Sequence, residues 1–249
     1  MSPSTVVHFV VESAAEINDS LGFPPFSDEM RYLKIYDGEE LIADTGKPRD
    51  DSENSFTTRM LLILESYCLS NPDLYSNMIS DVCVNYFRDN KGRKDFKPLF
   101  LINDLLRYWR TLCLNYEQCR DDPNKPWRKK NVNLRFSRLT TVFATVALLM
   151  IQRPTNSNEF VSYAYLTPLE RLARAVDALN NPDVGKSFEL FLNHYISFLR
   201  IKDSKNPEGM LKKGAIRQNL ANSANAISAF FVEIFNDKSL ANYSRYLML

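Results

Sequence analysis

The residues with the clearest capacity for binding chemistry are the arginines and lysines between positions 107 and 138. This segment holds nine basic residues against three acidic ones, although the whole chain has a formal net charge of only +1. The basic residues surround three aromatic ones, Tyr108, Trp109 and Trp127. They are Arg107, Arg110, Arg120, Lys125, Arg128, Lys129, Lys130, Arg135 and Arg138. Guanidinium groups present forked donors that match phosphate oxygens, so this group predicts an anion-binding face.

The spacing of four of these arginines sharpens that prediction. Arg107 and Arg110 are one helical turn apart, as are Arg135 and Arg138, so each pair could converge on one anion. The candidate phosphate- or nucleotide-binding residues are therefore Arg107, Arg110, Arg128, Lys129, Arg135 and Arg138.

A second interpretation of the basic residues is structural. Residues 1–60 carry twelve acidic and five basic residues, which is the opposite balance to the 107–138 segment. The arginines could then form a solvated face, or ion pairs with the acidic N-terminal region. The polarised charge favours this internal pairing, and the sequence leaves both interpretations open.

Groups that could carry catalysis or hold a metal are few. The two histidines, His8 and His194, both lie in apolar helical patterns and are interpreted as structural. Asp51, Ser52 and Glu53 could suggest a carboxylate pair for metal ions, but residues two apart point away from each other on a helix. We expect Asp51 or Ser52 to cap a helix instead. No HExxH, GxSxG, Walker A or GxGxxG motif occurs, so no catalytic residue and no metal ligand is predicted.

The composition indicates a soluble protein of a reducing compartment. The four cysteines lack the short paired spacings of a zinc or redox site and are interpreted as buried thiols. The N-terminus does not resemble a signal peptide. The longest apolar run, Leu139 to Ile151, has thirteen residues, short of the roughly 20 needed to span a bilayer. A cytoplasmic location with no membrane contact is therefore expected.

The apolar periodicity predicts a mainly α protein. Only seven glycines occur in 249 residues, too few for the turns of a β-architecture, and hydrophobic residues make up 45% of the chain. Apolar spacings of three and four predict helices over 4–21, 51–71, 72–87, 99–119, 131–151, 167–181, 182–203 and 210–236. The helices over 99–119 and 131–151 should form a hairpin that carries the basic residues.

Two smaller elements and the domain division complete the prediction. Residues 32–36 alternate weakly and could form a short strand, and a brief helix is expected over 37–45. Thr167 to Glu170 predicts a capping box with proline at the first helical position. We expect one compact multi-helix bundle over 1–249, with a possible division into 1–153 and 159–249.

Three stretches of the chain carry a resemblance to a known family. They are Pro98–Glu117, Asp50–Ser66 and Asn133–Arg138, within a likeness that extends over residues 30–175. They resemble the helical region that follows the catalytic core in a bacterial group of polymerase-beta-like nucleotidyltransferases. That core needs a GS-type turn and a DxD carboxylate pair, and neither occurs in this chain. The resemblance therefore implies the helical part alone, with no catalytic residue, and a divalent metal only where a catalytic half is supplied elsewhere.

Three functions follow from these observations. The first is a non-catalytic helical region that assists nucleotide or acceptor binding, together with a protein partner or segment that carries a catalytic core. The second is an interaction or regulatory module that binds a protein partner through its polarised faces. The third is nucleic-acid binding through the hairpin, which the near-neutral net charge supports only weakly.

Overall fold

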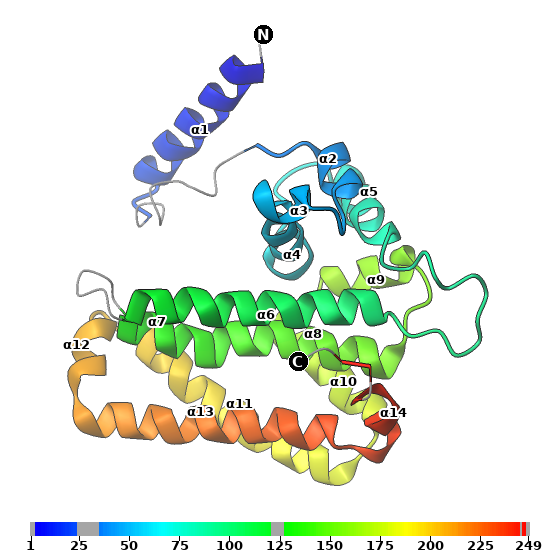
Figure 1. The fold of residues 1–249 in the computed structure, drawn as a ribbon. Helices are drawn as coiled ribbons and strands as arrows, with labels where there is room; N and C mark the ends of the chain where they lie inside the picture. The colour runs from blue at the N-terminus through cyan, green and yellow to red at the C-terminus, as the bar shows by residue number, and fades with distance from the viewer. Residues whose placement is uncertain (1–2, 24–34, 121–126, 245, 248–249) are drawn as a thin grey trace.

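Every regular element that the structure describes is a helix. The computed structural model describes residues 3–23, 35–120, 127–244 and 246–247, and the helices that follow residue 37 pack as a helical bundle (Figure 1). The fold class predicted from the sequence is therefore confirmed. The short strand expected near 32–36 falls mostly on residues outside the described ranges, and Ile35 and Tyr36 have no regular structure.

The helices follow one another with short connections. In chain order they are α1 (Pro3–Ser20), α2 (Gly38–Ala43), α3 (Arg49–Ser52), α4 (Ser55–Glu65), α5 (Pro72–Val84), α6 (Leu99–Arg120), α7 (Trp127–Asn133), the π-helical segment η2 (Leu134–Arg138), α8 (Leu139–Gln152), α9 (Ser157–Ala164), α10 (Pro168–Leu179), α11 (Pro182–Lys202), α12 (Pro207–Lys212), α13 (Gly214–Phe235), the 3-10 helix η3 (Lys238–Leu240) and α14 (Ala241–Ser244).

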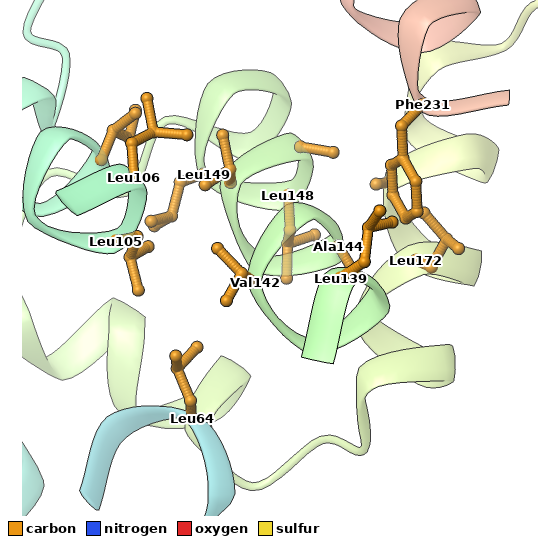
Figure 2. Close-up of a cluster of buried hydrophobic side chains, with 14 of the residues drawn as sticks. Leu64, Leu105, Leu106, Leu139, Val142, Ala144, Leu148, Leu149, Leu172 and Phe231 are labelled. Carbon is orange, nitrogen blue, oxygen red and sulfur yellow. The ribbon is translucent and has the colours of Figure 1, made fainter. Parts of the chain in front are cut away.

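Helix α8 lies at the centre of the bundle. Eleven of its fourteen residues are buried, which matches its run of almost unbroken apolar and small side chains. In Figure 2 its leucines and valine face Leu105 and Leu106 of α6 on one side, with Leu172 of α10 and Phe231 of α13 on the other. The buried cluster runs from Leu41 to Tyr243 and includes residues from both predicted segments of the chain. The predicted hairpin is confirmed, because α6 packs beside α8.

By length and composition, the continuous helix Trp127–Gln152 could cross a membrane, and the mean hydropathy of its most apolar 18-residue stretch is 1.5. Two observations assign it to the core instead. First, 67% of that stretch is buried, and second, α6, α10 and α13 pack around the second half of the helix. This arrangement is consistent with a soluble protein.

Two predicted helix boundaries are wrong and a third is displaced. Asp51 and Ser52 do not cap the helix that carries Phe56: they end the separate helix α3, and α4 begins at Ser55 after Asn54, whose φ is 61°. The last long helix is divided, because Lys213 has an extended backbone between α12 and α13. The helix predicted over 72–87 ends at Val84. In contrast, the capping box of Thr167 and Glu170 is present as predicted.

The carboxylates near the start of α4 are drawn into a buried polar network. Arg59 is fully buried, and its guanidinium donates to Asp50 over 2.6 Å and to the carbonyl of Leu41 over 3.1 Å. It also donates to the hydroxyl of Tyr86, which in turn donates to Asp104 over 2.9 Å. This network ties α2, α3, α4 and α6 together. The neighbouring Asp51 lies outside this network and pairs with Arg107.

A second buried arginine ties together the other side of the bundle. Arg171 on α10 is 1% exposed and has no carboxylate partner in the described structure. Its guanidinium donates to Thr145 Oγ1 of α8 and to the carbonyls of Tyr163 and Ala164 of α9 over 2.9 to 3.0 Å. A longer bond reaches the carbonyl of Ile63 on α4. Burial lowers the pKa of Arg171 to about 10, so the side chain is still charged at neutral pH.

Helix α1 is present as predicted, but its apolar residues do not enter the core. Figure 1 shows α1 standing apart from the helices that surround α8. Phe9, Val10, Ile17 and Leu21 are all exposed. The helix therefore presents an apolar face that no other part of the described chain covers.

The Arg59 network predicts a large and local stability effect. Replacing Arg59 by Met leaves Asp50 buried without its counter-charge, so we expect the free energy of unfolding to fall by about 3–5 kcal/mol in urea denaturation. Arg49→Met is the matched control, because the Arg49 side chain is 60% exposed, and we expect a change below about 0.5 kcal/mol. Similar losses for the two variants would contradict the structural role of the network.

The same network predicts a dependence on pH. Burial raises the pKa of Asp104 in the folded protein, so the folded state holds this proton more tightly than the unfolded chain. Its contribution to stability is therefore lost as the pH rises through the unfolded and then the folded pKa. Asp104→Asn should raise the free energy of unfolding at pH 7, and the gain should vanish near pH 3, below the ordinary aspartate pKa of about 3.9. An equal effect at both pH values would rule out this linkage.

Candidate functional site

Some of the predicted basic residues bind acids of the same chain, and others line a pocket. Arg107 on α6 pairs with Asp51 of α3, and its guanidinium lies 4.0 Å from the centroid of the Phe56 ring. Arg138 pairs with Glu65 of α4. The Arg107–Asp51 pair is the predicted pairing with the acidic N-terminal region, whereas Glu65 lies just beyond residues 1–60. Arg107 and Arg138 therefore carry neutralised charges in the observed structure.

The arginine pairs expected to converge on one anion do not do so in the observed side-chain conformations. Arg135 donates to Asn225 Oδ1 of α13 over 2.7 Å, whereas Arg138 is directed to α4. Arg107 is directed to Asp51, and Arg110 lies exposed one turn further along α6. The physical reason is the position of the partner groups, which lie on different helices on the two sides of the hairpin.

The π-helical segment η2 contributes to this divergence. It contains both Arg135 and Arg138 and joins α7 to α8 without a break in the helix. A π turn closes over five residues instead of four, so side chains three apart no longer share a face as they do on an α-helix. Such single π turns are often found at functional sites. The sequence pattern of this segment predicts an ordinary helix and contains no signal for the π turn.

A pocket opens between this segment and the C-terminal helices. Its volume is about 140 Å³. Its walls come from α7 and η2 on one side and from α12 and α13 on the other. The lining residues are Trp127, Arg128, Asn131, Val132, Arg135, Phe136, Leu211, Arg217, Leu220, Ala221 and Ala224. We call this site the cationic pocket.

The cationic pocket is lined mainly by apolar residues together with three arginines. The Arg128 guanidinium lies 4.9 Å from the centroid of the Trp127 ring, and Arg135 of η2 and Arg217 of α13 are the other two arginines of the lining. None of the residues that line the pocket is an Asp or a Glu. The positive charge in the pocket is therefore not balanced by its own walls, which distinguishes it from Arg107 and Arg138.

The predicted site residues are thus only partly brought together. Arg128 and Arg135 meet in the cationic pocket, together with the predicted aromatic residue Trp127. Arg107, Arg110, Lys129 and Arg138 do not line it. Sequence analysis missed Arg217 and the apolar residues of α12 and α13, because the pairing of α7 with the C-terminal helices cannot be inferred from helical periodicity.

A larger hollow, of about 500 Å³, lies between the α4–α5 loop and the start of α10. Its walls include Tyr67, Tyr75, Tyr165 and the buried Arg171. The guanidinium of Arg171 already donates to three carbonyls and a threonine hydroxyl, so little donor capacity faces the hollow. The cationic pocket is therefore the better candidate for binding an anion.

The acids, histidines and cysteines are the remaining candidates for a metal-binding or reactive site. No group of three or more His, Cys, Asp or Glu side chains there could hold a metal ion. His194 lies 3.1 Å from Ser223 Oγ through Nδ1 and links α11 to α13, in accord with a structural interpretation. The side chain of His8 lies outside the described atoms. Of the cysteines predicted to be buried, Cys83 is buried and its pKa is raised by burial, whereas Cys68 and Cys113 are partly exposed.

Comparison of the chain with known protein families, curated proteins and solved structures finds no match. The resemblance to the helical region of nucleotidyltransferases therefore stays a prediction from the sequence, and the site must be interpreted from its own geometry.

The two internal ion pairs predict small effects on stability. Arg107 and Arg138 are 41% and 38% exposed at their side chains, so solvent and salt screen both pairs. We expect Arg107→Ala and Arg138→Ala each to lower the free energy of unfolding by less than about 1 kcal/mol, with a smaller effect at 1 M salt. A loss of several kcal/mol that salt does not change would show that these arginines are integral to the core.

Proposed function

We propose that this chain is a non-catalytic helical binding module, whose cationic pocket takes an anion that carries an apolar ring. The observation that carries the proposal is the combination of three arginines and an apolar floor in a pocket that no carboxylate lines. The arginines supply forked, permanently charged donors for phosphate or carboxylate oxygens. The floor supplies an apolar surface that a ring can cover, and Trp127 provides an aromatic face for stacking.

The size of the pocket restricts the ligand. Pockets that enclose whole drug-sized molecules have volumes of about 300–1,000 Å³, whereas this one measures about 140 Å³. A single ring can enter, and the charged part of the ligand remains at the rim beside Arg128, Arg135 and Arg217. A pyrimidine nucleotide bound in this way would insert its single-ring base and leave its phosphates at the surface.

A nucleotide is the ligand class that the sequence favours. In the setting implied by the resemblance, the module would hold a nucleotide or an acceptor beside a catalytic half supplied by another segment or protein. That half would bring the divalent metal, since no metal site is proposed on this chain. A cytoplasmic location, where nucleotides are abundant, belongs to the same proposal.

A protein partner is the second candidate function, and one observation favours it. Phe9, Val10 and Ile17 of α1 are exposed, and an exposed apolar face commonly marks a contact surface. Nucleic-acid binding is less favoured, because the pairing of Arg107 and Arg138 with acids reduces the number of cations available to phosphates.

The proposal can be tested by the fluorescence of Trp127. The chain has two tryptophans, so Trp109→Phe leaves Trp127 as the single reporter in the pocket wall. We expect uridine triphosphate, whose base is a single ring, to change this fluorescence at lower concentration than uridine or inorganic triphosphate, because uridine lacks the phosphates and inorganic triphosphate lacks the ring. Arg135→Ala and Arg217→Ala should each weaken binding about tenfold or more, as charge-assisted hydrogen bonds are worth about 1.5–3 kcal/mol.

Arg107→Ala is the matched control for these variants. It removes the same side chain from the same hairpin, but Arg107 lies outside the pocket and is paired with Asp51. It should leave the affinity unchanged. The proposal fails if no nucleotide or aromatic carboxylate alters Trp127 fluorescence at millimolar concentration, or if Arg107→Ala weakens binding as much as Arg135→Ala.

A further inference from the structure

Helix α1 combines an exposed aromatic ring with a strongly one-sided charge. Phe9 is 63% exposed, and residues 3–23 contain three acids, Glu12, Glu16 and Asp19, but no lysine or arginine. Phe9 and Glu16 are seven residues apart, so they lie along one side of the helix. Val10, Ile17 and Leu21 occupy the adjacent side. This helix therefore presents an apolar ring with carboxylates beside it.

The cationic pocket has the complementary properties. An apolar cavity of about 150 Å³ can hold a benzene-sized group, and the pocket measures about 140 Å³. A phenylalanine ring therefore fits its floor. Arg135 and Arg217 on the walls would then face the acids that follow Phe9 along the helix. The pocket and α1 are therefore complementary in charge and in size.

We infer that α1 of a second copy of this chain docks on the cationic pocket, with Phe9 inserted between α7 and α13. This inference rests on the proposed function of the pocket as a site for an anion with an apolar ring. No α1 residue lines the pocket of the same chain, and α1 stands apart in Figure 1, so the helix is presented outward. Each copy offers one helix and one pocket, so a reciprocal exchange closes a two-fold dimer with two identical contacts.

Charge exchange between two variants tests the contact in the full-length chain. The first variant reverses the helix (Glu16→Lys with Asp19→Lys), and the second reverses the pocket (Arg135→Glu with Arg217→Glu). We expect the wild-type chain to dimerise at micromolar concentration in sedimentation velocity at 150 mM salt. Each variant alone should dimerise at least tenfold more weakly, because like charges then meet at both contacts. An equimolar mixture of the two variants should recover the association. In the mixed dimer, each helix docks on a pocket of the opposite charge.

Two matched substitutions of exposed apolar residues distinguish specific docking from nonspecific hydrophobic association. Phe9→Ser should weaken dimerisation, whereas Leu190→Ser on α11 should not, although both residues are just over 60% exposed. Circular dichroism and thermal unfolding of each variant check that the bundle is intact. The substituted residues of α1 lie outside the buried core, so we expect these variants to fold like the wild-type chain.

Three outcomes would overturn the inference. The first is a wild-type chain that stays monomeric up to about 100 µM, well above the micromolar range expected. The second is a mixture of the two charge-reversed variants that fails to associate. The third is equal loss on Phe9→Ser and Leu190→Ser. If the protein is monomeric but Trp127 still responds to nucleotide, the inference fails and the proposed function stands. If the charge exchange restores association and no nucleotide binds, the pocket serves self-association instead of nucleotide binding.

Discussion

The burial of α8 is the constraint on which the rest of the structure depends. A helix that is apolar on nearly every side cannot face water, so it must be covered all round. In this chain α4, α6, α10 and α13 provide the cover, and they come from positions between 55 and 235. To cover α8 on all sides, the chain must place helices from distant parts of the sequence around it. The short connections and the buried cluster that extends from Leu41 to Tyr243 follow from that requirement.

Helices packed around an apolar centre need further contacts that fix their positions, and two buried arginines supply them here. Arg59 ties α2, α3 and α4 through a carboxylate, a carbonyl and a tyrosine hydroxyl, while Arg171 ties α4, α8, α9 and α10 mainly through carbonyls. Many of the other charges are used in the same structural way. Arg107 and Arg138 bind acids contributed by α3 and α4. The cationic pocket differs because its arginines face an apolar floor.

The elements that were predicted well are those set by local pattern. The helices α1, α6 and α8 and the capping box of Thr167 and Glu170 all depend on residues three or four apart, which periodicity records directly. The failures have two causes. Asp51 does not cap α4 because it lies in the separate helix α3, which ends before the left-handed turn at Asn54. Arg217 was missed because its place beside Arg128 depends on how α13 folds back, which no local pattern encodes.

The π-helical segment sets the rotation of the pocket wall relative to the core. A π turn accommodates one more residue than an α turn, and each residue of an α-helix corresponds to a rotation of about 100°. The extra residue in Leu134–Arg138 therefore rotates everything before it, including Trp127 and Arg128, relative to the buried face of α8. Loss of a single residue there would restore a regular helix and turn the pocket wall away from α13, while the leucines of α8 kept their places. The orientation of the binding surface is thus set by the length of one helical turn, which Phe136 anchors to the core by stacking on Phe198.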